Sequence, residues 1–284
     1  MAVKIGVVDV GSNTIRLLLA QVEGSGLVPI EKERVRLSLG AEIERTGVVS
    51  DVSIAAAAKA VTKLCGLARR GGAETLDVFL TAPGRQSANA GELVDAIARA
   101  SEHSVRILST EEEGRLAYAG AVATADVELP GRIAVCDVGG ASTEIAVGAP
   151  GSAPRWIESV DIGSVRLTER GCDMRTEASE AFAGIDPPRV DAALAVGGSA
   201  RAARRLVGPW LGEPELAAAM RIVATKPEST ISRRYGVHRT RAKILPAGLV
   251  LLAEVQERLG VPLHVCDGGI REGAVLATVA ELAA

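Results

Sequence analysis

Two short segments of this sequence share a pattern that suits phosphate chemistry: an apolar run ends in aspartate, and glycine and small polar residues follow. The first segment contains Asp9, Gly11, Ser12, Asn13, Thr14 and Arg16, and the second contains Asp137, Gly139, Gly140, Ser142, Thr143 and Glu144. Glycine lets the backbone approach an anion closely, and the free amides and hydroxyls of such a turn donate hydrogen bonds to phosphate oxygens. An aspartate at the end of the strand can hold Mg²⁺ beside the phosphate. One such turn is usually an ordinary hairpin, but two copies predict a pair of phosphate-binding loops.

A run of three glutamates, Glu111 to Glu113, lies where a predicted strand leads into a predicted helix. In one interpretation these residues only begin the helix, because Thr110 and Glu113 can form a capping box and acidic side chains stabilise a first helical turn. In the other, a glutamate is a catalytic base, since α/β folds place ligands at the carboxyl ends of their strands. The residues alone favour the cap slightly and leave the base open.

Arg85 is a lone basic residue in the segment from Thr81 to Asn89, which we predict to be a loop between a strand and a helix. Guanidinium groups bind phosphate oxygens in pairs. An arginine in a solvated loop is an equally good interpretation of the same residue. Phosphate binding by Arg85 therefore rests on the other segments.

The elements that must position these residues occur in the same order twice. In each half, three predicted strands are followed by alternating helices and strands, and the Asp-Gly turn follows the first strand. A duplicated strand and turn indicates an internal repeat of domain size. We therefore predict an α/β protein of two related domains, residues 1–124 and 125–284, with the last helix able to pack back on the first domain. A length of 284 residues also favours two domains over one.

The composition of the chain excludes several classes of protein. The net charge of −3 gives no general attraction to nucleic acids or acidic lipids, so neither is expected as a partner. The four cysteines and three histidines have no metal-ligand spacing, which predicts reduced thiols in a cytoplasmic protein. The segment before Asp9 is too short for the apolar core of a signal peptide, and no apolar run is long enough to span a membrane.

Together these segments resemble the exopolyphosphatase/guanosine pentaphosphate phosphohydrolase (Ppx/GppA) family, a branch of the actin-like ATPase and sugar-kinase superfamily. The motifs that carry the resemblance are residues 9–17, 81–89, 109–115, 137–144, 162–167, 197–198, 241–248 and 268–273. The resemblance implies two related actin-like, ribonuclease H-like domains flanking a cleft, in the short form without further helical domains. It also implies a homodimer.

The same resemblance implies a phosphoanhydride hydrolase that removes the terminal phosphate of inorganic polyphosphate or, alternatively, of guanosine pentaphosphate. Mg²⁺ is the implied cofactor, with Mn²⁺ as an alternative and K⁺ as an activator. The resemblance makes Glu113 the base, with Glu112 as its neighbour, and Asp137 a further catalytic residue. It places Asp137, Glu144 and Asp9 at the metal. Phosphate binding falls to the first loop, Gly11, Ser12, Asn13, Thr14 and Arg16, to Arg85, and to the second loop, Gly139, Gly140, Ala141, Ser142 and Thr143.

The sequence departs from the family pattern at two places: the second loop, which with the short length leaves a regulatory protein open, and the segment that aims Arg85. Ala141 replaces a loop glycine, and Pro83-Gly84 replaces an Ala-Leu pair beside Arg85. The alternatives are a small-molecule kinase of the same superfamily and a regulatory protein that binds polyphosphate or an alarmone without cleaving it. A polyphosphate chain would need a basic track beyond the cleft, and at least half of the candidates are expected to be merely solvated. These candidates are Arg201, Arg204, Arg205, Arg233, Arg234, Arg239, Arg241 and Lys243.

Overall fold

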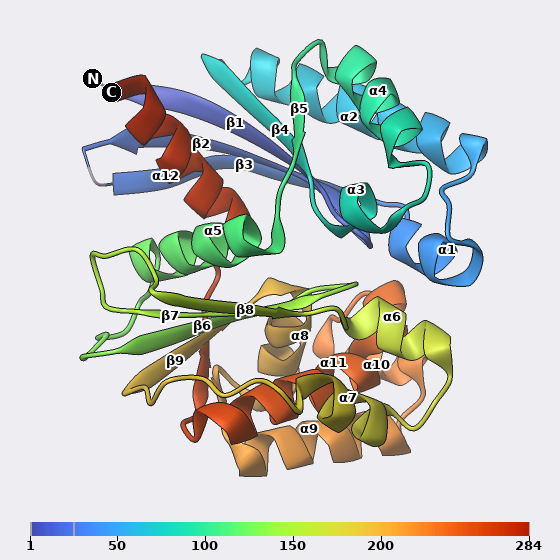
Figure 1. Cartoon of the computed structure of the whole chain (residues 1–284), viewed down its shortest axis with the longest axis vertical. Helices are drawn as coiled ribbons and strands as arrows, with labels where there is room; N and C mark the ends of the chain where they lie inside the picture. The colour runs from blue at the N-terminus through green and yellow to red at the C-terminus, as the bar shows by residue number, and fades with distance from the viewer. Residues whose placement is uncertain (1, 25, 284) are drawn as a thin grey trace.

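Two α/β lobes lie one above the other in the computed structural model, which describes residues 2–24 and 26–283 (Figure 1). The N-terminal half contains β1 (Val3–Val10), β2 (Thr14–Glu23), β3 (Gly26–Arg36), α1 (Leu39–Thr46), α2 (Asp51–Arg70), β4 (Thr75–Leu80), α3 (Ala82–Gln86), α4 (Ala90–Ser101), β5 (Val105–Ile107) and α5 (Thr110–Ala123). The C-terminal half contains β6 (Ile133–Val138), β7 (Thr143–Gly148), β8 (Trp156–Val160), α6 (Ser164–Arg170), α7 (Met174–Phe182), β9 (Ala192–Val196), α8 (Gly197–Val207), β10 (Trp210–Leu211), α9 (Glu213–Thr225), α10 (Glu228–Tyr235), α11 (Arg239–Leu259), β11 (Leu263–Val265) and α12 (Ile270–Ala283).

The two sheets have the same central topology. The N-terminal sheet has the strand order β3-β2-β1-β4-β5, and the C-terminal sheet has the order β10-β11-β9-β6-β7-β8. Strand β1 pairs antiparallel with β2 and parallel with β4, and β6 pairs in the same way with β7 and β9. The C-terminal sheet differs by the short strand β10 at its edge. The predicted α/β fold with two related halves is confirmed.

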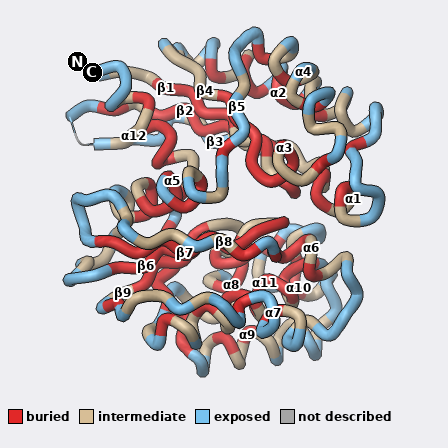
Figure 2. The backbone as a smooth tube through the Cα atoms, in the orientation of Figure 1, coloured by how far each residue is buried: buried red, intermediate tan, exposed pale blue. Residues whose placement is uncertain are grey.

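Side chains of β1 alternate between two apolar cores. Val8 and Val10 pack with buried residues of α2 and α4, whereas Ile5 and Val7 pack on the opposite face with residues of α5 and α12. Because helices cover both faces of the sheet, β1 is a nearly continuous apolar run rather than an alternating one. Figure 2 shows the buried strands at the centre of each lobe, with the exposed backbone at its periphery.

Helix α12 is last in the sequence but packs on α5 and β1 of the N-terminal lobe. The two helices approach so closely that a Cβ added at Gly120 would lie 2.0 Å from the carbonyl oxygen of Gly269. One added at Gly273 would lie 2.0 Å from the carbonyl oxygen of Leu116. Glycine is required at both positions because backbone fills the space that a side chain would need. The division of the chain into domains at residue 124 stays a prediction.

Four helices were not predicted from the sequence. One of them, α3, lies in the segment from Thr81 to Asn89, which was expected to be a loop, and it has Pro83 in its first turn. Proline is tolerated there because the first amides of a helix have no intrahelical partner. The others are α1, α9 and α10, for which no periodic apolar pattern was identified. These omissions matter for α1 and α3, because both lie close to the loops described below.

All four cysteines are free thiols. Cys65, Cys136 and Cys266 are buried, and Cys172 is exposed just beyond α6. Among the helices in the described part of the chain, none combines the length and the apolar character needed to cross a membrane.

Candidate active site

The two predicted phosphate loops face each other between the lobes. A Cβ added at Gly140 of the second loop would lie 3.1 Å from Ser12 Cβ and 3.8 Å from the Asn13 amide nitrogen of the first. Both loops line one small cavity of about 90 Å³. The lining residues that the sequence predicted are Asp9, Gly11, Ser12, Asn13, Thr14, Arg16, Glu113, Asp137, Gly139, Gly140, Ala141, Ser142 and Glu144. Of the predicted residues, Glu112, Arg85 and Thr143 do not line it.

Each of the two loops is closed by an equivalent backbone hydrogen bond. The Gly11 amide donates to the Thr14 carbonyl at 3.1 Å, and the Gly139 amide donates to the Ser142 carbonyl at 3.1 Å. The strand register places Asp9 opposite Arg16 in the first lobe and Asp137 opposite Glu144 in the second. Arg16 and Glu144 therefore occupy equivalent positions of the duplicated fold but carry opposite charges. Thr143 is fully buried and its hydroxyl donates to the Ile162 carbonyl at 2.8 Å, which gives Thr143 a structural role.

The helix cap at the glutamate run differs by one residue from the sequence prediction. Ser109 is the N-cap of α5, and its capping box is with Glu112 rather than with Glu113. The Ser109 amide donates to Glu112 Oε2 at 2.7 Å, and the Glu112 amide donates to Ser109 Oγ at 3.1 Å. Each residue of an α-helix is rotated by about 100° from the one before it. Glu113 therefore leaves the cap, is 4% exposed and lines the cavity.

Arg85 contacts the predicted base rather than the cavity. Its Nη1 forms an ion pair with Glu113 and donates to the Leu108 carbonyl at 2.6 Å. Its Nη2 is buried without a hydrogen-bond partner. Arg85 thus pairs with Glu113 without lining the cavity itself. Direct phosphate binding by Arg85 stays a prediction.

Burial raises the pKa of every carboxyl group around the cavity. For Glu144 the pKa rises to about 7, because burial and the nearby Asp137 charge both oppose ionisation. The pKa of Glu113 is raised well above its usual value by burial and by Glu144, while Arg85 acts in the opposite direction. The pKa values of Asp9 and Asp137 are also raised by burial. Carboxyl groups with raised pKa values in a cleft are typical of catalytic sites.

Partly buried arginines lie near these carboxyl groups. Burial lowers the pKa of Arg201 to about 10 and that of Arg241 to about 9, and repulsion from Arg16 adds to both shifts. The pKa of Arg271 is lowered by the same two causes. Burial raises the pKa of Asp137, and nearby positive charges partly offset that rise. These charges belong to Arg201, Arg16, Arg241 and Arg271. The sequence had suggested Arg201 and Arg241 only as members of a basic track.

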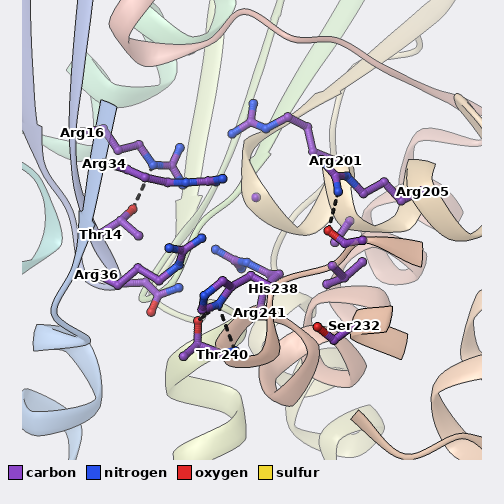
Figure 3. A pocket seen from close by; sticks show the side chains of 15 residues that line it. Thr14, Arg16, Arg34, Arg36, Arg201, Arg205, Ser232, His238, Thr240 and Arg241 are labelled. Atoms are coloured by element: carbon purple, nitrogen blue, oxygen red, sulfur yellow. Dashed lines mark hydrogen bonds between the residues drawn. The ribbon is translucent and has the colours of Figure 1, made fainter. Parts of the chain in front are cut away.

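A second cavity of about 460 Å³ continues from the first and shares Asn13, Thr14, Arg16, Gly198 and Arg241 with it. Figure 3 shows arginines from β2 and β3 on one side of this cavity and arginines from α8 and α11 on the other. The lining contains six arginines and no carboxylate: Arg16, Arg34, Arg36, Arg201, Arg205 and Arg241. We call it the arginine cavity.

Arg34 and Arg36 were missed in the sequence. They lie on β3 opposite Arg16 and Thr14 of β2, so the hairpin brings them to the first loop. The signal was present as Arg-Val-Arg in a predicted strand, where alternate residues share a face. The sequence also predicts that this strand forms a hairpin with the strand over residues 14–22, and the pairing of β2 with β3 confirms it. What the sequence did not indicate was the register that sets Arg34 and Arg36 opposite Arg16 and Thr14.

The acidic residues of the cavity offer a donor set that suits Mg²⁺. Within residues 2–24 and 26–283, no three His, Cys, Asp or Glu side chains are grouped closely enough to enclose a metal ion by themselves. Mg²⁺ is usually bound by one or two carboxylates together with water and substrate phosphates. Asp9 and Asp137 are partly buried, and the charge of Asp137 acts on the pKa of Asp9, so this pair fits that mode of binding. A metal that shares its ligands with a phosphate is therefore compatible with the site.

The family model for the Ppx/GppA phosphatase family matches residues 18–187. The chain therefore belongs to this family, and its fold and paired loops agree with that membership.

Among relatives, an uncharacterised protein of Streptomyces coelicolor is 32% identical over 57% of this chain and 48% of its own length. Exopolyphosphatase 2 of Mycobacterium tuberculosis is 31% identical over 59% of this chain and 54% of its own length. The chain thus spans about half the length of these relatives. A structure of the Aquifex aeolicus PPX-GPPA enzyme is 25% identical, with a TM-score of 0.81 over 98% of this chain and 100% of that one.

Proposed function

We propose that this protein is an exopolyphosphatase that hydrolyses the terminal phosphoanhydride bond of inorganic polyphosphate. One observation carries the proposal: the small cavity between the two loops adjoins the arginine cavity and shares five lining residues with it. A terminal phosphate fits the first, and the following phosphates of the chain fit the second. Among the arginine cavity's lining residues there is no phenylalanine, tyrosine or tryptophan on which a base could stack. Polyphosphate, which is charged along its whole length and has no base, suits such a lining.

The reaction follows from the groups around the first cavity. The oxygen of a water molecule attacks the terminal phosphorus, and the bond from that phosphorus to the bridging oxygen breaks. Orthophosphate and a chain shorter by one phosphate are released. In this proposal Glu113 takes the proton from the water, for which it must be ionised. The amides of both loops and the Arg241 guanidinium stabilise the charge on the phosphate oxygens.

We further propose that Asp9 and Asp137 hold Mg²⁺ together with phosphate oxygens, with Glu144 next to them opposite Asp137. When bound, the cation supplies positive charge that neutralises the phosphate. Its charge would also favour the ionised forms of these carboxyl groups, which burial disfavours. The residues' own task is to hold the phosphate in line with the attacking water and to exclude bulk water from the cavity.

A direct test measures orthophosphate release from long-chain polyphosphate, tripolyphosphate and guanosine pentaphosphate, with Mg²⁺ and with EDTA. We expect the highest kcat/KM with long-chain polyphosphate and loss of release in EDTA. Equal or better hydrolysis of guanosine pentaphosphate would replace polyphosphate by that nucleotide. Transfer of phosphate from ATP to a small acceptor, without release from either substrate, would contradict hydrolysis altogether.

Guanosine pentaphosphate is the second candidate because the cavity branches. A third cavity of about 410 Å³ meets the arginine cavity at Arg16, Arg34 and Arg201. A nucleotide with two phosphate groups on one ribose could occupy two branches. The lining of the third cavity, however, includes the carboxylates Glu33 and Asp267, whereas the arginine cavity has no carboxylate in its lining. For this reason we place polyphosphate first.

A further inference from the structure

Ion pairs join α1 of the N-terminal lobe to α6 of the C-terminal lobe, and Figure 1 shows these two helices facing each other across the gap between the lobes. Glu44 of α1 accepts hydrogen bonds from Arg166 Nε at 2.6 Å and from Arg170 Nε at 3.1 Å. Beside them, Arg45 Nε lies 3.6 Å from Glu169 Oε2. The side chains of Glu44 and Arg166 are 17% and 13% exposed, so this pair is better shielded from water than a surface ion pair.

Helix α1 is attached directly to the first phosphate loop. The Gly40 amide at its start donates to the Ser12 carbonyl at 2.7 Å, and the Leu37 and Ser38 amides donate to the Asn13 carbonyl at 3.3 Å. A Cβ added at Gly40 would lie 2.7 Å from Ser12 Cβ. The start of α1 therefore cannot shift without displacing this loop.

Helix α6 is attached in the same way to the second loop. The Ser164 amide donates to the Gly139 carbonyl at 3.0 Å, and the Val165 amide donates to the Gly140 carbonyl at 2.8 Å. A Cβ added at Gly163, the residue before the helix, would lie 2.5 Å from the Ala141 amide nitrogen. Each loop is thus tied to one helix, and the two helices are tied to each other by charge.

We propose that Glu44, Arg166 and Arg170 are positioning residues that fix the spacing between the two phosphate loops. The substrate named in this inference comes from the proposed function, whereas the contacts between the helices and the loops do not depend on it. The ion pairs bridge the lobes, whereas the hydrogen bonds that attach each helix to its loop lie within one lobe. Breaking the pairs lets the loops separate, and a phosphate then loses contact with one of them. Small displacements of this kind are costly because catalysis depends on close alignment.

The spacing between the lobes can be measured without any substrate. Cys172, the one exposed native cysteine, lies beyond α6, and Val52 at the start of α2 is 80% exposed. Spin labels on Cys172 and on a Val52→Cys variant report the distance between the lobes by double electron–electron resonance. We expect a narrow distribution in the parent protein and a broader one, extended to longer distances, in Glu44→Gln.

Steady-state kinetics with polyphosphate as the substrate are the second measurement. We expect Glu44→Gln to raise KM about tenfold with a smaller change in kcat, because an opened form must close before it binds. Glu44→Asp keeps the charge and should restore most of the affinity. The matched control is Asp77→Asn, which removes an ion pair to Arg106 within one lobe and should change neither distance nor KM.

Glu169→Gln, which removes the partner of Arg45, serves as a second variant if Glu44→Gln folds poorly by circular dichroism, and it should broaden the distribution less. Unchanged distances and KM in the folded variants would overturn the proposal. If no substrate is hydrolysed but the distances change as expected, the positioning role stands and the proposed function fails.

Discussion

Glu112 and Glu113 are neighbours in the sequence, yet the helix gives them different surroundings. Glu112 completes the capping box with Ser109, while Glu113 is buried in the cavity beside Arg85. The competing interpretations of this segment are therefore both realised, but on different residues. Capping explains the glutamate at the third position of the helix and leaves the buried Glu113 without a capping role.

Exchange of the two glutamates for glutamine separates these roles. Glu113→Gln should lower kcat for phosphate release by about 10²- to 10⁴-fold, because the amide cannot take a proton from water. Glu112→Gln is the control, since glutamine still accepts the hydrogen bond of a capping box. Steady-state kinetics and thermal unfolding of both variants make the test. Near-parental kcat in Glu113→Gln would remove Glu113 from the reaction.

The raised pKa of Glu144 predicts how stability depends on pH. Its folded-state pKa is about 7, above its usual value of 4.5, so the folded protein retains a proton that the unfolded chain loses. This contribution is present in full below pH 4.5 and is lost as the pH rises through 7. Over that window, Glu144→Gln should reduce the fall in unfolding free energy by about 1–3 kcal/mol.

Urea unfolding at several pH values, without substrate or divalent cation, measures this dependence. The control is Glu158→Gln, an exposed glutamate on the neighbouring strand β8. An identical pH dependence in the parent protein and in Glu144→Gln would show that Glu144 titrates normally.

At the scale of elements, the short helices α1 and α6 hold the two phosphate loops in position through hydrogen bonds to their carbonyls. Helix α1 was missed in the sequence because it is only about two turns long, yet its start supports the first loop. Helix α6 begins at Ser164 after Gly163, which lies against the backbone of the second loop. Glycine is needed at Gly163 for close approach and not for its backbone angle, since its φ of −138° is open to any residue.

Alanine at Gly163 tests this close approach. The added Cβ would lie 2.5 Å from backbone atoms of Gly140 and Ala141, so the second loop must move. We expect a loss of about tenfold to a hundredfold in kcat/KM, in line with the cost of small misplacements. Gly91→Ala in α4 is the control, because nothing lies within 4 Å of its new Cβ. It should leave kcat/KM unchanged and leave stability equal or slightly higher.

At the scale of the whole molecule, positive charge gathers where the two lobes meet, although the net charge of the chain is −3. Arg34 and Arg36 come from the N-terminal sheet, and Arg201, Arg205 and Arg241 come from helices of the C-terminal lobe. Burial lowers the pKa of Arg36, and repulsion from Arg34 and Arg16 adds to that shift. Binding of a polyanion would relieve this repulsion, so the arrangement favours such a ligand over an empty cavity.

Removal of single arginines tests whether the arginine cavity binds the chain of phosphates. Arg34→Ala and Arg36→Ala should each raise KM for long-chain polyphosphate by about two- to fivefold. They should also weaken its dependence on salt, since fewer charges take part. Tripolyphosphate, which is shorter, should be affected less. Arg70→Ala, at the exposed end of α2, is the control, and an equal effect there would assign the change to general charge.

The sequence by itself determined the two Asp-Gly turns, the duplicated α/β pattern and the family. These features are local or periodic, so they can be identified without knowing what packs against them. Tertiary structure decided that Arg85 pairs with Glu113, that Arg34 and Arg36 reach the cavity, and that Glu44 meets Arg166 across the lobes. Each of these contacts joins residues far apart in the chain or on adjacent strands. Their geometry depends on strand register, helix rotation and the docking of the two lobes, which no local pattern specifies.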